Sequence, residues 1–416
     1  MSRKVSIVGA GQGGLMLGIG LVDAGYDVTI LSDRTADEIR TGTVPSSAGL
    51  SPDAQRAEEE LGLNYWDDEV ETLQGVYLDV VMPDGNVATT LKGPWGYEGG
   101  DWRCVDLRLK YWRWMHEFER RGGKLVVKEA TVVDVEECAE RSDLTVIAAG
   151  KGEISRLFER DEERSTWSEP PRNLSMIITK GHPGWVEKAG FRPLHYIIFV
   201  GAGEIFSGTF LNATEERAVF HIFEAVPGGP IDRFGDVSSA EEQLRVSKEI
   251  FRDLAPWEWE RVKDMQLADP GGGFRGRFTP SVRKPVVRLS SGAIATGMGD
   301  TLCLKDPVGG QGANSAAKGA QHLLARVLER GGGPFDADWM YDTWNSFWER
   351  YEQYADRFNN QLLRPQEFQI GLIFAAAQNP ELARKLFYGF SHPPSASPWF
   401  FDEQEAGRLV SAGSAA

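Results

Sequence analysis

The chain has 416 residues, of which 41% are hydrophobic and 25% charged, a composition typical of a globular protein with two packed units. The net charge of −16 argues against nucleic acid as a partner, because phosphate binding needs a basic surface. No apolar stretch approaches the length of a membrane span, and the strand after Lys4 leaves no room for a signal peptide. The odd number of widely spaced cysteines (Cys104, Cys138, Cys303) indicates reduced cytoplasmic thiols, with neither metal spacing nor a disulfide framework.

The first 150 residues begin with a strand–helix–strand pattern. Residues 4–8 and 28–31 predict buried parallel strands, and residues 12–24 between them predict a helix that ends at Gly25. The segments that follow are a hairpin over 76–81 and 87–91, a helix over 107–121, two short strands in LVVKEATVVDVE (125–136) and a buried strand within 142–152.

The second part of the chain is rich in strands before it returns to the first pattern. Residues 175–226 predict several strands, 240–254 a helix, and GGGF (271–274) a loop. Residues 293–300 predict a strand, 312–330 a helix, and the tail from about 336 to Pro393 is expected to be helical.

This order predicts an α/β protein in which strand-rich insertions interrupt the first domain. We expect a discontinuous nucleotide-binding domain, a β-sheet substrate domain and a helical C-terminus. The predicted boundaries are 1–45, 100–165 and 285–335 for the first, 46–99 and 166–284 for the second, and 336–416 for the third.

A glycine motif marks the first candidate ligand site. Gly9-x-Gly11-x-x-Gly14 lies between a strand and a helix, where it allows a tight turn, a close approach of pyrophosphate, and close packing of helix on strand. NAD and FAD proteins share this motif. The acid that would bind the ribose is expected directly after the second strand, where Ser32 stands, and Asp33 follows one residue later. Asp33 is therefore either the ribose ligand or an ordinary surface aspartate.

The stretch GMGDTLCLKDPVGGQGAN (297–314) favours FAD. Asp300, after Gly299, could bind ribityl hydroxyls, and the backbone amides at the start of the next helix could stabilise the negative charge of reduced flavin. The candidate cofactor residues in this stretch are Gly299, Asp300, Pro307, Gly310, Gln311, Gly312, Ala313 and Asn314.

With these motifs the chain resembles the styrene and indole monooxygenases, the FAD-dependent oxygenase components of two-component systems. The resemblance runs nearly from end to end through VGAGQGGLMLG, VTILSDR, VDLRL, RGGKLVV, SDLTVIAAGKG, VGAGEIF and GDTLCLKDPVGGQGAN. It implies a Rossmann-type FAD-binding domain of the para-hydroxybenzoate hydroxylase kind, with Asp33 and Arg34 ending the second strand as in the family. Arg108 would belong to the flavin domain and meet the pyrophosphate, or else form a surface salt bridge.

The resemblance also implies the source of electrons. One-component hydroxylases carry an Asp-Gly motif after the middle strand, whereas this chain has Ala148, Ala149 and Gly150 there, with Gly150 close to the flavin. We therefore expect a separate NAD(P)H-dependent flavin reductase to supply reduced FAD, which reacts with O2 to give a C4a-hydroperoxide. We leave a homodimer open.

The segment TVPSSAGL (43–50) should lie beside the flavin ring by the same resemblance. Ser46, Ser47 and Pro307 are the candidate catalytic residues, and Ser46 matches the indole branch, where the styrene branch has asparagine. The candidate pocket residues are Pro45, Ser46, Ala48, Leu50, Leu73, Val76, Phe206, Phe210 and Phe223, although a phenylalanine in such a strand is more often plain core. These residues favour epoxidation or hydroxylation of an indole-like double bond. The alternatives are a styrene-type epoxidase or sulfoxidase, and a non-catalytic FAD-fold binding protein.

Overall fold

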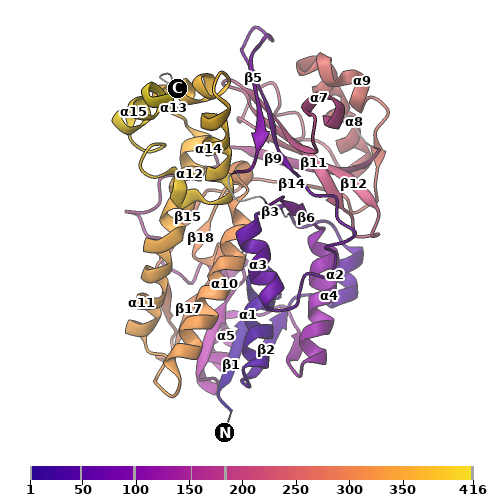
Figure 1. The fold of residues 1–416 in the computed structure, drawn as a ribbon. Coiled ribbons are helices and arrows are strands. Elements are labelled where there is room, and N and C mark those ends of the chain that lie inside the picture. Colours follow the sequence, from indigo (N-terminus) through magenta and orange to yellow (C-terminus); the bar gives the residue numbers. More distant parts are fainter. Residues whose placement is uncertain (1, 47–48, 97–99, 151, 182–184, 414–416) are drawn as a thin grey trace.

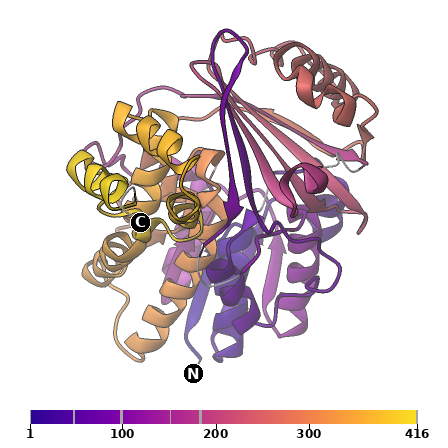
Figure 2. The same cartoon turned by 45° about the horizontal axis from the view of Figure 1, so that its top comes forward.

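The computed structural model describes residues 2–46, 49–96, 100–150, 152–181 and 185–413. Two β-sheets and a group of C-terminal helices make up the molecule (Figure 1), with the first sheet nearest the N-terminus. The second sheet lies on the far side of the first sheet's carboxyl edge, and the C-terminal helices lie beside it (Figures 1 and 2). The predicted mixed α/β class with a helical C-terminus is confirmed.

The first sheet has six strands, and its neighbouring strands are parallel except for one antiparallel pair at the edge. In spatial order they are β16 (Val286–Arg288), β17 (Ile294–Gly297), β8 (Leu144–Ile147), β1 (Lys4–Val8), β2 (Asp27–Ser32) and β7 (Lys124–Val127). Both faces are buried: β1 places Ile7 in one apolar core and Val8 in the other. The carboxyl ends of β1, β8 and β17 meet at one edge, where open parallel sheets bind their ligands.

Helices cover both faces of this sheet. The core that contains Ile7 is shared by α1 (Gln12–Asp23), α4 (Leu107–Arg120) and α10 (Gln311–Arg330), and the opposite core includes α5 (Val132–Arg141). The other short elements of this region are α2 (Ala36–Thr41), β3 (Gly49–Leu50), α3 (Pro52–Glu60), β6 (Arg103–Cys104) and α6 (Gly152–Ser155).

The hydrophobic core moves one predicted domain boundary. Leu50, Ala54 and Leu63 pack in the same core as α1 and α10, not against the second sheet. The residues around α3 therefore belong with the first sheet, although we predicted that the substrate domain begins at residue 46.

The second sheet has eight strands, in the order β13-β9-β12-β11-β10-β4-β5, with β14 pairing with β9. Among the strands that the structure describes in this sheet, only β4 and β10 are parallel neighbours. The strands are β4 (Gly75–Val81), β5 (Val87–Pro94), β9 (Asn173–Lys180), β10 (Pro193–Phe199), β11 (Gly203–Leu211), β12 (Arg217–Ala225), β13 (Gln266–Leu267) and β14 (Gly273–Gly276).

The alternation of side chains gives this sheet two buried faces. Phe206, Phe210 and Phe220 belong to a core that also contains residues of the C-terminal helices, and we call this the inner face. Phe223 belongs to the opposite core, which α8 (Ala240–Leu254) and α9 (Trp259–Val262) cover. The short helix α7 (Trp185–Ala189) contacts β10.

The C-terminal helices fill the space over the inner face. They are α11 (Ala337–Phe347), a π-helical turn (Trp348–Glu352), α12 (Gln353–Leu363), α13 (Glu367–Ala376), α14 (Pro380–Ser391), a 3₁₀ turn (Pro393–Ala396) and α15 (Glu403–Gly413). Phe358, Phe387 and Phe400 bury their rings in the core shared with the sheet. In the part of the chain that the structure describes, no helix combines the length and apolar character needed to cross a bilayer.

Two predicted elements are wrong. The segment 125–136 contains one strand, β7, followed by helix α5, although its alternating valines suggested two strands. Thr131 and Asp134 explain the helix, because each caps the backbone of the other in a capping box. The loop predicted at 271–274 ends in strand β14, where Gly273 and Phe274 pair with β9.

Candidate active site

The glycine turn between β1 and α1 combines tight packing with open space. A Cβ at Gly9 would lie 2.7 Å from the Ala148 carbonyl oxygen, and one at Gly14 would lie 2.1 Å from the Gly9 oxygen. Gly9 also has a φ of +117°, which favours glycine. In contrast, a Cβ at Gly11 would meet no atom within 4 Å. Because Gly11 is the N-cap of α1, this open side of the turn fits a pyrophosphate at a helix N-terminus.

The end of β2 adjoins this turn, since the Gly9 amide donates to the Leu31 carbonyl at 2.9 Å. The Ser32 side chain is buried, and its hydroxyl donates to the Arg34 carbonyl at 2.7 Å, so Ser32 shapes the turn. The Asp33 side chain is 64% exposed and forms an ion pair of 3.4 Å with Arg34. Asp33 is thus the accessible carboxylate at the position where a ribose would lie.

The turns after β8 and β17 touch each other. A Cβ at Gly150 would come within 2.5 Å of the Asp300 Cβ, so only glycine leaves room for this contact. Arg283 fixes the 3₁₀ turn Gly299–Thr301 by donating to the carbonyl oxygens of Asp300 and Thr301, at 3.2 and 2.9 Å. Asp300 itself is exposed at the carboxyl edge of the sheet, where the predicted ribityl ligand would be needed.

The loop after Asp300 leads into the N-terminus of α10. It contains β18 (Cys303–Leu304), which pairs with β15 (Ser281–Val282), and the 3₁₀ turn Pro307–Gly309. Asp306 caps this turn by accepting the Val308 amide at 3.1 Å. Gly310 then takes a left-handed conformation (φ +64°) as the N-cap of α10. A Cβ at Gly312 would meet no atom within 4 Å, so this helix start also faces open space.

The Gln311 side chain is engaged within the protein. Its amide nitrogen donates to the carbonyl oxygens of Gly309 and Phe390, at 2.8 and 2.7 Å, and Tyr351 donates to its amide oxygen at 3.1 Å. A flavin contact at Gln311 would therefore use the backbone amide. Together, the open helix start at Gly312, the exposed Asp300 and the open side of Gly11 fit a flavin dinucleotide.

Asn314 joins the segment 43–50 to this loop. Its buried side chain accepts the Ser51 amide at 2.8 Å and donates to the carbonyl oxygens of Gly49 and Gly310, at 3.1 and 2.7 Å. The Trp102 ring lies between the same two segments, because a Cβ on Gly49 or Gly310 would approach it to 3.1 or 3.2 Å. The structure therefore brings the predicted catalytic segment next to the predicted flavin loop.

Within this segment Pro45 and Ser46 are partly exposed, and the Val44 amide donates to the Gly271 carbonyl at 2.9 Å. Leu50 is buried in the core of the first sheet. Ser47 and Ala48 lie outside the described residues.

Arg108 is buried in a charge network that connects the two sheets. Its guanidinium pairs with Asp106 at 2.7 Å and with Asp269 at 2.8 Å, and it also donates to the Gly42 carbonyl at 3.1 Å and to Asn212 at 3.2 Å. Burial lowers its pKa, but the hydrogen bonds to Asp269 and Asp106 outweigh this and hold it above the ordinary value. Arg108 thus holds Gly42, which directly precedes the segment 43–50, and its ion pairs are buried and not on the surface. Its contact with a pyrophosphate stays a prediction.

Four of the predicted pocket residues share the inner-face core: Leu73, Val76, Phe206 and Phe210. Phe223 does not, because its side chain packs against Phe251 of α8 on the opposite face of the sheet. The prediction for Phe223 is wrong because side chains alternate between the two faces of a sheet. Phe223 lies opposite Ile205, the neighbour of Phe206, and therefore points to the other face. The sequence alone does not reveal this register.

The sequence analysis missed Trp95 and Trp102. Their rings stack at 4.7 Å, and their indole nitrogens donate to the Leu73 carbonyl and the Ser391 hydroxyl, each at 2.8 Å. Both belong to the inner-face core. No motif marks them, because their hydrogen bonds to Leu73 and Ser391 join residues that are distant in sequence.

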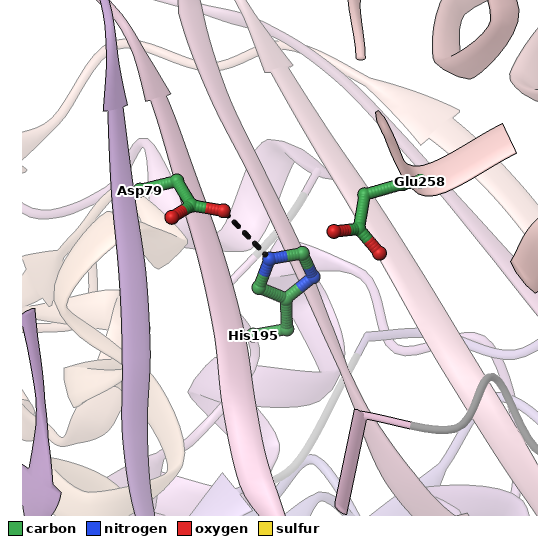
Figure 3. A group of neighbouring side chains, drawn as sticks. All are labelled: Asp79, His195 and Glu258. Atoms are coloured by element: carbon green, nitrogen blue, oxygen red, sulfur yellow. Dashed lines mark hydrogen bonds and ion pairs between the residues drawn. The ribbon is translucent and has the colours of Figure 1, made fainter. Parts of the chain in front are cut away.

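Three potential metal ligands lie close together on the face of the second sheet opposite the inner face, although no metal site was expected. Figure 3 shows Asp79 and His195 on neighbouring strands and Glu258 from the segment beyond α8. The Lys188 ammonium already pairs with both carboxylates, at 3.3 Å from Asp79 and 2.7 Å from Glu258. Trp185 adds a hydrogen bond of 2.9 Å to Glu258. Lys188 therefore supplies the positive charge that a metal ion would bring.

The chain is similar to known proteins over most of its length. Residues 150–261 match the family described as "Styrene monooxygenase A putative substrate binding domain". Styrene monooxygenase StyA of Pseudomonas fluorescens is 28% identical over 411 residues, covering 94% of each chain. Its counterpart from a Pseudomonas species is 26% identical and covers 99% of this chain and 98% of its own.

Solved structures show the same fold at lower identity. A mutant of 2-methyl-3-hydroxypyridine-5-carboxylic acid oxygenase has a TM-score of 0.62 and 18% identity, covering 92% of this chain and 97% of its own. A mutant of the flavin-dependent brominase Bmp2 has a TM-score of 0.67 and 14% identity, covering 99% and 98%. The fold and these relatives support a flavin-dependent monooxygenase. Within that class the chain is similar to the styrene monooxygenases over nearly its whole length, which confirms the predicted resemblance.

Proposed function

We propose that this chain is the oxygenase component of a two-component system. It would receive reduced FAD from a separate NAD(P)H-dependent reductase and use O2 to epoxidise or hydroxylate an indole-like double bond. The observation that carries the proposal is the position of the open helix start at Gly312. It adjoins the open helix start at Gly11, where Gln12 contacts the Ala313 carbonyl, and Asn314 bonds it to Gly49 of the segment that contains Ser46. The unpaired thiols Cys104, Cys138 and Cys303 are in keeping with a reducing, cytoplasmic location.

The division of labour follows from chemistry. Bound reduced flavin would activate O2 and supply one oxygen atom, so the protein needs no nucleophile of its own. Backbone amides at the start of α10 would favour the negative charge of the reduced ring, and Asp300 would hold the ribityl chain. The apolar inner face, with Leu73, Val76 and Phe210, would orient the substrate and exclude water.

Electron supply by a partner is supported by the turn after β8. Gly150 packs directly against Asp300, and the preceding Ala148 and Ala149 offer no charged group for a second nucleotide. Purified protein with FAD should therefore consume neither NADH nor NADPH at a measurable rate until a flavin reductase is added. Rapid consumption without reductase would show a one-component enzyme and defeat this part of the proposal.

Ser46 supports an indole-like substrate. A serine beside the flavin leaves more space than asparagine and offers one hydroxyl, which suits a bicyclic substrate with an N–H group. The rival is a styrene-type epoxidase, which the 28% identity to styrene monooxygenase favours. Chemically reduced FAD, O2 and a panel of indoles, styrenes and sulfides would decide, with product formation as the measurement. Styrene turnover faster than that of every indole tested would favour the rival.

A further inference from the structure

Two buried glutamates oppose each other on the inner face of the second sheet. Glu204 of β11 and Glu224 of β12 are direct cross-strand partners, with 6% and 0% of their surfaces exposed. Two negative charges in this arrangement would repel each other in a water-free environment. At most one of them can therefore be charged without a compensating cation.

The compensating cation belongs to Glu204. Arg172 binds its carboxylate at both oxygens, with distances of 2.8 and 2.9 Å. The remaining contacts of Arg172 are to the carbonyl oxygens of Pro171 and Leu363. Burial raises the pKa of Glu204, but this two-point contact favours its charged form. No cation in the described part of the chain makes a hydrogen bond or ion pair with Glu224.

Glu224 instead faces Asp306, the residue that caps the turn before Gly310. Neither Glu224 oxygen meets a donor group, and Asp306 already accepts the Val308 amide. An ionised carboxylate can only accept hydrogen bonds. Two carboxyl groups can therefore share a hydrogen bond only if one of them carries a proton. The Val308 amide favours the charged form of Asp306, whereas no donor group among the described residues contacts Glu224, so Glu224 is the group that holds the proton. Burial and the adjacent Asp306 raise the pKa of Glu224 well above its usual range, in agreement with this assignment.

We infer that Glu224 is a neutral carboxylic acid that donates a hydrogen bond to Asp306 and thereby positions the 306–314 loop against the substrate sheet. The inference rests on the proposed function insofar as this loop holds flavin. Arg172, Glu204 and the buried Tyr196 are the other charged or titratable groups that face the pair. Because Glu224 is neutral, the Glu224–Asp306 pair carries one negative charge instead of two beside a loop that would receive the anionic reduced flavin.

The first test needs no flavin. Glu224 is protonated in the folded protein and ionised in the unfolded chain at neutral pH, so folding takes up one proton. The unfolding constant of wild type relative to Glu224→Gln should therefore rise about tenfold per pH unit between pH 6 and 8. The apo protein should also show an infrared C=O band of a protonated carboxyl group that Glu224→Gln removes. A ratio independent of pH, or a band that persists in the variant, would overturn the inference.

Glu204→Gln is the matched control, because Glu204 lies opposite Glu224 but is paired with Arg172. This variant should be less stable than wild type by a similar factor at each pH, and it should retain the protonated carboxyl band. Loss of that band in Glu204→Gln, but not in Glu224→Gln, would show that Glu204 carries the proton and would refute our inference.

The second test links the pair to the loop. Glutamine can still donate to Asp306, whereas leucine cannot, so Glu224→Gln should bind FAD within about twofold of wild type and Glu224→Leu about tenfold more weakly. Equal losses in both variants would overturn the positioning role, as would unchanged binding in a folded Glu224→Leu protein. If wild type bound no FAD, the proposed function would fail, while the infrared band and the unfolding ratio would still decide the proton.

Discussion

Asn314 offers the sharpest test of how the site is assembled, because its side chain joins the segment 43–50 to the start of α10. Asn314→Ala removes the acceptor of the buried Ser51 amide and the donor to the carbonyl oxygens of Gly49 and Gly310. An unpaired buried amide costs about 1–3 kcal/mol, and each lost neutral hydrogen bond about 0.5–1.5 kcal/mol. We expect the free energy of unfolding to fall by about 2–6 kcal/mol.

The measurement is urea unfolding of the apo protein, together with FAD binding followed by flavin fluorescence at a temperature where the variant is folded. FAD affinity should fall as well, since the loop and the segment are no longer held together. Asn173→Ala is the control: it removes one hydrogen bond of 2.9 Å to Asp232 at the second sheet and should leave FAD affinity unchanged. Wild-type affinity in a destabilised Asn314→Ala protein would refute our account of the loop.

Other outcomes follow from single side chains. Asp300→Ala should weaken FAD binding about tenfold to a hundredfold, because a charge-assisted hydrogen bond of about 1.5–3 kcal/mol is lost, and unchanged affinity would remove the ribityl assignment. Ser46→Ala should slow indole oxidation by about 2–10-fold in a steady-state assay with reduced FAD, and untouched kinetics would exclude a substrate contact. The hydrogen bond from His392 lowers the pKa of Asp53 from 3.8 to about 2, so its contribution to stability is complete above pH 4 and lost as the pH falls toward 2. Asp53→Asn should therefore lower stability at pH 7 and flatten the acid limb of an unfolding profile, whereas an unaltered limb would exclude the interaction.

The sequence was most informative where a local pattern determines the structure. The helix at 240–254 matches α8 because Ser239 caps it, and the βαβ opening follows from buried runs around glycines whose added Cβ atoms would clash. The loop 307–314 was recognisable because its glycine-rich motif follows Gly299-Asp300 at a helix start, and in the structure Gly310 takes a left-handed conformation there.

The features that the sequence did not predict depend on strand register and on contacts between distant segments. Phe223 and Phe210 look equivalent in sequence, and only the pairing of β11 with β12 sends them to opposite faces. The hydrogen bonds of Trp95 and Trp102 to Leu73 and Ser391 also join segments that are distant in sequence. The helix at 132–141 was missed because its valines suggested a strand. In the structure the capping box of Thr131 and Asp134 starts a helix there, since the strand preference of valine depends strongly on context.

The buried network of Arg108 limits how the molecule can open. To separate the first sheet from the second at this point, the guanidinium would have to give up its buried ion pair with Asp269 while it stays with Asp106, and breaking a buried ion pair costs several kcal/mol. A hinge between the layers is therefore a poor route for exchanging a cofactor. If flavin enters reduced and leaves oxidised in every cycle, its passage would depend on movements of surface turns while the two sheets stay together. Turnover and global unfolding should therefore respond differently to temperature.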